Sequence, residues 1–284
     1  MYYLFKCLLR SKSGIHAHDC AKSRSSVIVK IYNKMAIATY AERTFDYLVG
    51  FLDAETKHNY TISVNYGSCK LLTRPFLLHD IIMATDQWER EIKDVIYNEI
   101  KKDDVVIDVG AYVGDYTIPL AKRASKVIAF EPNPETAKIL EKNIILNQLR
   151  NVKLFTKAVG DTKSRVKFHM SQKPLFSGVV GSPPVTAILR TEGNITRDCT
   201  TEVETVDLDS ILSNENRLDW LLIDAEGYEI NALNGATKIL TRHSPKIIIE
   251  IQPENLDSVK KILVDKGYYI TQLNSLVFYA RKHI

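Results

Sequence analysis

The chain has 284 residues, 45% of them hydrophobic, and a formal net charge of +4. This content can fill one substantial α/β core plus an appendage. No run of eighteen apolar residues occurs, so no transmembrane helix is expected, and the apolar start is charged too early for a signal peptide. We therefore expect a cytoplasmic protein. The four cysteines form no CxxC pair and indicate neither a zinc ribbon nor a disulfide framework: Cys7, Cys20, Cys69 and Cys199.

Residues 1–34 form a basic N-terminal extension. They hold seven Lys/Arg and one acid, so the extension carries +6 and the remaining residues sum to −2. Three interpretations stay open: a disordered or loosely packed arm, a segment in weak contact with a membrane surface or RNA, and sequence upstream of a true start at Met35. His16, His18 and Cys20 could ligate a metal, but no second cluster completes a tetrahedral set, and we expect no metal site.

Residues 35–84 are predicted to form an N-terminal adapter region. Apolar residues lie near helical spacing at 39–52, and residues 60–73 alternate enough for a hairpin. A helix is predicted at 85–104. Its buried stripe consists of Trp88, Ile92, Val95, Ile96 and Ile100.

The stretch VVIDVGAYVGDYT, residues 105–117, is the most informative part of the chain. A β-branched strand runs into a turn with Gly110 and Gly114, and helix-compatible sequence follows from Tyr116. Such a strand, turn and helix can present backbone N–H groups to a nucleotide-like ligand. A turn that binds nothing could have the same sequence, so the interpretation depends on the residues downstream.

The next predicted strand, residues 127–131, ends in Glu131, 17 positions after Gly114. Dinucleotide-type sites place an acid about 20 residues on, where its carboxylate accepts two hydrogen bonds from the ribose hydroxyls. The alternative is a solvated carboxylate at a strand end. Asn133 then predicts a helix N-cap. A dinucleotide fingerprint also needs a middle glycine, and Tyr112 stands in its place, which disfavours NAD.

A third strand, together with the segment that follows it, is predicted at residues 151–161. Residues 162–204 are predicted to form an insertion that begins with one strand. The rest of the insertion is polar and punctuated by glycine and proline. Long connections of this kind are usually lids or flexible segments, so we place the insertion on the substrate side, with Ser177 and Gly178 at its inner edge. The sequon at Asn194 is treated as chance because no secretory signal is expected.

Acids follow two further predicted strands. Strand 220–223 runs into Asp224 and Glu226, and Glu250 ends another apolar run. Because the carboxyl ends of parallel strands meet at one crevice, we expect these acids near Gly110. Such a cluster needs a sulfonium, an amino group, a shared proton or a divalent metal to offset its charge. Alternatively, Glu250 only hydrogen-bonds a neighbouring loop.

One helix is predicted after these acids, and a hairpin closes the chain. The helix presents Ile230, Leu233, Thr237 and Leu240 inward. Two strands around Asn274 are expected to pair antiparallel.

Taken together, these motifs resemble the FkbM family of class I S-adenosylmethionine methyltransferases. The D-x-G-x-x-x-G turn from Asp108 to Gly114, with the acid at Glu131, resembles the first two class I motifs. Three downstream segments are similar to the family's tlD, kiDvEGaE and iiE elements: VDLDSIL at 206–212, LDWLLIDAEGYEINALNGA at 218–236 and PKIIIEI at 245–251. The chain departs from the pattern at Tyr112, where the family usually has Asn, and at Leu222, where it usually has Lys.

The resemblance implies a Rossmann-like, doubly wound, mostly parallel α/β sheet with an antiparallel C-terminal hairpin over residues 85–284, and S-adenosyl-L-methionine as cofactor. In the family an aromatic-Glu element, here Trp88 and Glu89, closes one side of the pocket. The residue aligned with a common adenine-binding acid is Ala158. The candidate cofactor-binding residues are Glu89, Asp108, Gly110, Ala111, Tyr112, Gly114, Glu131, Pro132, Ala158 and Asp224. The candidate catalytic residues are Asp224 and Glu226.

The expected chemistry is methyl transfer to oxygen. The chain has no D/N-P-P-Y segment for amine methylation and no Pro-Cys nucleophile, whereas a carboxylate-lined crevice suits removal of a hydroxyl proton. The resemblance implies hydroxyls of sugars, glycolipids or other small metabolites as acceptors. An RNA methyltransferase anchored by the basic arm and a non-catalytic nucleotide-binding scaffold remain alternatives. Because the positive charge lies in the extension, nucleic acid is not the expected partner. The oligomeric state stays open.

Overall fold

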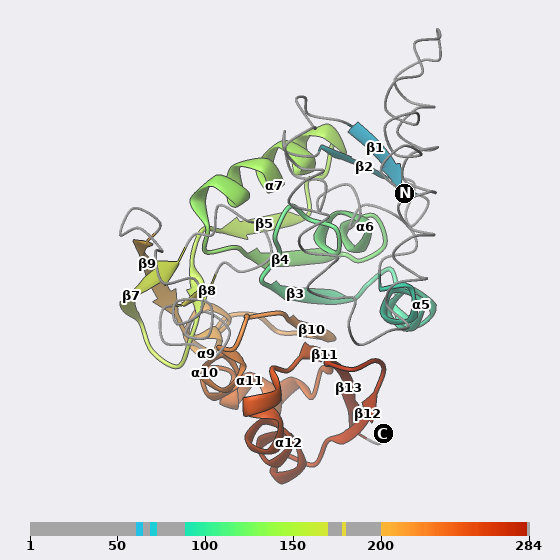
Figure 1. Ribbon diagram of the computed structural model, residues 1–284. Helices are drawn as coiled ribbons and strands as arrows, with labels where there is room; N and C mark the ends of the chain where they lie inside the picture. The colour runs from blue at the N-terminus through green and yellow to red at the C-terminus, as the bar shows by residue number, and fades with distance from the viewer. Residues whose placement is uncertain (1–60, 65–68, 73–88, 170–177, 180–199, 283–284) are drawn as a thin grey trace, which may run out of the picture.

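The structure, a computed structural model, describes residues 61–64, 69–72, 89–169, 178–179 and 200–282 (Figure 1). Several predictions fall outside these residues: the basic extension, the helix at 39–52, Trp88, Ser177 and most of the insertion. Within the described ranges, no helix has the length and apolar character needed to cross a membrane.

A seven-stranded sheet forms the centre of the molecule, in the order β12-β13-β11-β10-β3-β4-β5 (Figure 1). Its strands are β3 (Val105–Val109), β4 (Lys126–Phe130), β5 (Val152–Phe155), β10 (Trp220–Ile223), β11 (Lys246–Glu250), β12 (Tyr269–Gln272) and β13 (Val277–Arg281). The five strands from β5 to β11 are parallel, and β13 runs antiparallel to both β11 and β12. The predicted doubly wound sheet with a closing hairpin is confirmed.

Helices cover both faces of this sheet (Figure 1). One face carries α9 (Leu208–Ile211), α10 (Glu229–Asn234), α11 (Thr237–His243) and α12 (Leu256–Asp265), with the 3₁₀ turn η3 (Pro253–Asn255) leading into α12. The other carries α5 (Arg90–Glu99), α6 (Thr117–Ala121) and α7 (Pro134–Leu146). Strand residues alternate between the two layers: Ile107 packs with the first group, and Val106 with the second. Burial on both faces explains the continuous β-branched runs.

Strand β3 lies where the chain changes direction across the sheet. The strands that follow it first, β4 and β5, lie on one side, and β10 and β11 lie on the other. In open α/β sheets, ligands bind outside the carboxyl ends of the strands at this switch point. The order of the strands therefore directs attention to the ends of β3 and β10.

A smaller sheet follows β5. It contains β6 (Ala158–Val159), β7 (Ser164–His169), β8 (Gly178–Val179) and β9 (Thr200–Val206), in the order β6-β9-β7-β8. Strand β7 pairs antiparallel with both β8 and β9. The strand predicted at the start of the insertion is thus confirmed as β7.

The predicted hairpin before the domain is also confirmed, as β1 (Thr61–Val64) and β2 (Cys69–Leu72). Helix α7 holds β2 through side-chain amides. The N–H of Leu72 donates to Asn143 Oδ1 over 2.6 Å, and the N–H of Lys70 donates to Asn147 Oδ1 over 2.9 Å. The hairpin therefore packs on the same layer as α6 and α7.

The prediction of one helix after the acidic segment is wrong, because α10 and α11 are separate. They break at Gly235, where an added Cβ would lie 2.0 Å from the Gly160 carbonyl oxygen. This close approach to another backbone shifts the register of the second helix. Thr237, predicted to face inward, is exposed, and Ala236 and Ile239 are buried in its place.

Candidate active site

Three backbone N–H groups of the glycine turn after β3 donate hydrogen bonds to other groups of the protein. The N–H groups of Gly110 and Ala111 donate to the Phe130 carbonyl oxygen over 2.9 and 3.0 Å. The N–H of Tyr112 donates to Glu131 Oε2 over 2.9 Å. The expectation that this turn presents N–H groups to a ligand is therefore wrong for these three residues.

Residues in the left-handed backbone region gather around this turn. Among non-glycine residues, Glu89, Tyr112 and Glu226 have φ values of 48°, 48° and 47°; the other two described, Gln148 and Ser244, lie at helix ends. A left-handed residue with a Cβ costs roughly 1–2 kcal/mol, and such outliers cluster at functional sites. In sequence, these three residues lie far apart, so the clustering arises from the fold.

The carboxylate of Glu131 fastens the turn to the start of α7. Besides the Tyr112 bond, Glu131 Oε1 accepts from the N–H of Asn133 over 2.8 Å, and the side chain is 6% exposed. Asn133 then caps α7 as predicted, accepting from the N–H groups of Glu135 and Thr136. Glu131 is thus a buried, oriented carboxylate at the end of β4.

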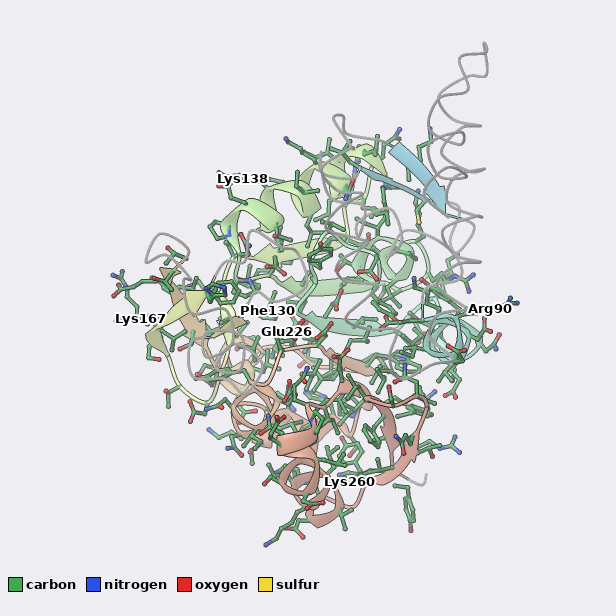
Figure 2. All side chains as sticks on the ribbon, viewed as in Figure 1. Arg90, Phe130, Lys138, Lys167, Glu226 and Lys260 are labelled. Atoms are coloured by element: carbon green, nitrogen blue, oxygen red, sulfur yellow. The ribbon has the colours of Figure 1, made fainter. Side chains whose placement is uncertain are left out.

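The acidic loop after β10 lies directly against the glycine turn. An added Cβ on Gly110 would lie 1.8 Å from the Asp224 carbonyl oxygen, and the N–H of Asp224 donates to Val109 O over 2.9 Å. Figure 2 labels Glu226 and Phe130 at the end of the central strands that lies toward the small sheet. The predicted meeting of the turn and the acidic segment is confirmed for Asp224.

Two residues that the sequence reasoning missed hold this loop. Glu229 is fully buried; its Oε1 accepts from the Gly227 N–H over 2.6 Å, and its Oε2 accepts from Asn255 Nδ2 over 2.7 Å. Asn255 Nδ2 also donates to the Gly227 carbonyl oxygen over 3.0 Å. The EGYE segment pointed to Glu229, but Asn255 lies 26 residues away and carries no local signal.

Glu89 approaches the site from the start of α5. Its carbonyl oxygen accepts from the N–H groups of Ile92 and Lys93, both over 3.0 Å, so Glu89 begins the helix. Its Oε2 accepts from the Tyr116 hydroxyl over 2.7 Å. Tyr116 directly precedes α6, so this hydrogen bond joins the N-terminal ends of α5 and α6.

The sequence pattern of the Methyltransferase FkbM domain matches residues 108–270, more than half of the chain. This chain belongs to the FkbM methyltransferase family. The matched region includes the glycine turn, Glu131 and the acidic loop.

Other relatives of this FkbM protein match over shorter stretches. The chain is 34% identical over 86 residues to the probable ribosomal RNA small subunit methyltransferase A of Methanosphaera stadtmanae, covering 30% of this chain and 28% of that protein. It is 33% identical over 93 residues to a tRNA (guanine(37)-N(1))-methyltransferase of Phytophthora infestans, covering 33% and 22%. The match spans less than a third of the length of these relatives.

Similar solved structures include methyltransferase FkbM from Methylobacillus flagellatus, with a TM-score of 0.44 and 14% identity over 83% of this chain and 58% of that chain. The M. jannaschii tRNA m1G37 methyltransferase has a TM-score of 0.43 and 15% identity, covering 80% and 58%.

The carboxyl groups of the FkbM chain's acidic loop have raised pKa values. Burial raises the pKa of Asp224 well above its usual range, and the charge of Glu250 raises it further. Burial likewise raises the pKa of Glu226, with Asp224 as the second cause. The Asp224 side chain is nevertheless exposed to solvent. Asp224 therefore lies at the surface of the acidic loop, with its backbone against Gly110.

Two further acids lie beneath the turn. Burial raises the pKa of Asp115 to about 7 and that of Asp108 to about 6. Asp108 Oδ2 accepts from Thr117 Oγ1 over 2.5 Å, which fastens α6 to β3. Asp115 Oδ2 has no hydrogen-bond partner among the described residues, and the charge of Lys93 partly offsets the rise in the pKa of Asp115. The sequence reasoning assigned no role to Asp115.

The remaining predicted residues differ in burial. Ala111 is buried, and Pro132 is half-buried after Glu131. Ala158 lies in β6 and packs with Phe168 and the partly buried Tyr228, next to the acidic loop. Across the part of the chain that is described, no three His, Cys, Asp or Glu side chains are grouped to hold a metal ion.

Proposed function

We propose that this chain is an S-adenosylmethionine-dependent methyltransferase that methylates a hydroxyl oxygen on a sugar, a glycolipid or another small metabolite. The observation that carries the proposal is the contact between the glycine turn and the acidic loop at the ends of β3 and β10, where Gly110 lies against Asp224 and the acids have raised pKa values. We propose that the cofactor binds in a crevice at these strand ends. Membership of the FkbM family supports methyl transfer. We propose residues 85–284 as the catalytic unit, preceded by an adapter at 35–84.

The residues present fit an adenosyl cofactor better than a dinucleotide. A pyrophosphate needs backbone N–H groups at the turn, and those of Gly110, Ala111 and Tyr112 already have acceptors. The N–H groups of Tyr112 and Asn133 orient the Glu131 carboxylate at the end of β4, and a carboxylate can accept hydrogen bonds from ribose hydroxyls. When bound, S-adenosylmethionine supplies an electrophilic methyl group on a positively charged sulfur. The acids around Asp224 favour a cation in the crevice.

We assign the cofactor contacts to residues of the turn, the end of β4, the start of α5 and the acidic loop. They are Glu89, Gly110, Ala111, Tyr112, Gly114, Glu131, Pro132, Ala158 and Asp224. Asp108 acts indirectly, since its bond to Thr117 holds α6 in place.

The acids of the loop can take a proton from the acceptor. A general base works best when its pKa lies near the operating pH, and burial moves the pKa of Asp224 and Glu226 upward from the acidic range. An attacking hydroxyl would pass its proton to one of these carboxylates as oxygen approaches the methyl group. We therefore assign the catalytic roles to Asp224 and Glu226.

RNA is the second candidate acceptor, because two relatives are named as ribosomal RNA and tRNA methyltransferases. The acidic crevice disfavours phosphates close to the reacting centre, since like charges repel. An RNA substrate would then need positive charge elsewhere, such as the basic residues of 1–34.

Calorimetric titration tests the cofactor assignment. We expect the protein to bind S-adenosylmethionine and S-adenosylhomocysteine and not NAD. Glu131→Ala should weaken S-adenosylhomocysteine binding about tenfold or more, because a hydrogen bond to a charged group is worth roughly 1.5–3 kcal/mol. The exposed neighbour Glu135→Ala serves as the control. Since Glu131 also fastens the turn, the Tm of each variant must be measured. NAD binding tighter than S-adenosylhomocysteine would contradict the proposal.

A labelled methyl donor and separated glycan, lipid and RNA fractions identify the acceptor class. Label in glycans or lipids is expected. Label in RNA that declines steeply with salt would favour the second candidate. If the protein binds the cofactor but labels none of the fractions, the result would favour a non-catalytic nucleotide-binding scaffold.

A further inference from the structure

We propose that Tyr116 is a positioning residue whose hydroxyl holds the Glu89 carboxylate in the wall of the crevice, where it meets the positively charged end of the cofactor. The inference rests on the proposed function and adds to it a residue that does not itself touch the cofactor.

The hydrogen bond between these residues is short and joins separate elements. The Tyr116 hydroxyl donates to Glu89 Oε2 over 2.7 Å, within the range of charge-assisted O–H···O bonds. Glu89 precedes α5, and Tyr116 precedes α6. The bond therefore fixes one carboxylate relative to the helix that follows the glycine turn.

Two effects disfavour the observed position of the Glu89 carboxylate. Its charge raises the pKa values of Asp224, Glu250 and Asp115, so the Glu89 carboxylate is destabilised whenever these groups are ionised. Its backbone is also left-handed, with φ 48°. Both effects oppose the observed arrangement, and the Tyr116 hydroxyl stabilises it.

The ring of Tyr116 is itself held in place. Lys93 Nζ lies 5.5 Å from the ring centroid, and Lys93 is 2% exposed, so a desolvated cation packs on the aromatic face. Burial and the charge of Glu89 raise the pKa of Tyr116 well above its usual range. The phenol therefore stays protonated and keeps donating its hydrogen bond through the neutral pH range.

A double-mutant cycle tests this role. Tyr116→Phe keeps the ring and removes the donor, and we expect S-adenosylmethionine to bind about three- to tenfold more weakly. This is less than for loss of a direct charged hydrogen bond, because Tyr116 acts on the cofactor only through Glu89. Turnover at saturating cofactor should stay within about twofold, because the residue positions a binding group. In a Glu89→Gln background, Tyr116→Phe should add no further loss.

Tyr268→Phe is the matched control. Tyr268 is a buried tyrosine that packs in the layer of α12, and its hydroxyl has no hydrogen-bond partner among the described residues. This variant should bind the cofactor as the wild type does.

Three results would overturn the inference: wild-type affinity in Tyr116→Phe, losses that multiply across the cycle, or an equal loss in Tyr268→Phe. If Tyr116→Phe does not fold, Glu89→Asp is the alternative variant. It keeps the negative charge but moves the carboxylate away from the Tyr116 hydroxyl, and it should show the same loss of S-adenosylmethionine affinity. Wild-type affinity in Glu89→Asp would then overturn the inference. A wild-type protein that binds no S-adenosylmethionine contradicts the proposed function instead.

Discussion

Gly110 sets the closest approach in the candidate site. Its φ of 84° and the position of the Asp224 carbonyl oxygen leave no room for a side chain. Around it, Glu89, Tyr112 and Glu226 adopt the same unfavourable region of backbone space. Single residues therefore shape the candidate site mainly through backbone conformation, and the carboxyl groups of Glu89 and Glu226 supply charge.

A glycine comparison measures this constraint. Gly110→Ala should cost at least about 3 kcal/mol of unfolding free energy, or prevent folding, because it combines a left-handed φ with backbone overlap. Gly267 has a similar φ of 82°, but a Cβ added there would meet no atom within 4 Å. Gly267→Ala should therefore cost only about 1–2 kcal/mol. Urea unfolding measures both, and equal losses would contradict the importance of the close approach.

At the scale of elements, four parallel strand ends assemble the site: β3, β4, β10 and β11. Much of this could be predicted from sequence, because buried strands, the Asn133 cap and the glycine turn leave local patterns. The break at Gly235 could not, since it depends on the Gly160 carbonyl oxygen. The bond from Tyr116 to Glu89 likewise joins residues whose proximity no periodicity encodes.

The assembled acids predict a pH-dependent stability. Burial raises the pKa of Glu250 from 4.5 to about 8, with the charge of Glu226 as the second cause. The native state thus keeps this proton after the unfolded state has lost it, so the free energy of unfolding declines as pH rises between these values. Glu250→Gln carries no such proton and should be more stable than the wild type by about 1–3 kcal/mol at pH 8, and by much less at pH 5.

Denaturation of the cofactor-free protein at both pH values provides the measurement. Glu254→Gln is the control, because Glu254 is exposed on the same segment. A Glu250→Gln variant that is less stable than the wild type at pH 8 would show that Glu250 is held by a favourable partner.

The whole molecule separates its charge by region. Residues 1–34 carry +6, and the remainder sums to −2, while other acids surround Asp224 in the proposed crevice. The family match begins at residue 108, well after the basic segment. The excess of positive charge therefore lies in a different part of the chain from the candidate active site.

Deletion of residues 1–34 tests that separation. The shortened protein should keep its cofactor affinity and its Tm, because the sheet and its two helical layers are built from residues downstream. Its binding to heparin or RNA should weaken, since the net charge changes from +4 to −2. An insoluble or unfolded product would place the extension in the core.

The central claim is that the acids after β10 serve methyl transfer. Its most direct test is the rate of labelled methyl transfer from S-adenosylmethionine by the wild type, Asp224→Asn and Glu226→Gln, with cofactor affinity measured in parallel. We predict that at least one variant loses about 10² or more in turnover while its affinity stays within a few-fold. A parallel decline of affinity and turnover in Asp224→Asn would assign that residue to the cofactor. Wild-type turnover in both variants, with the fold intact, would contradict the claim.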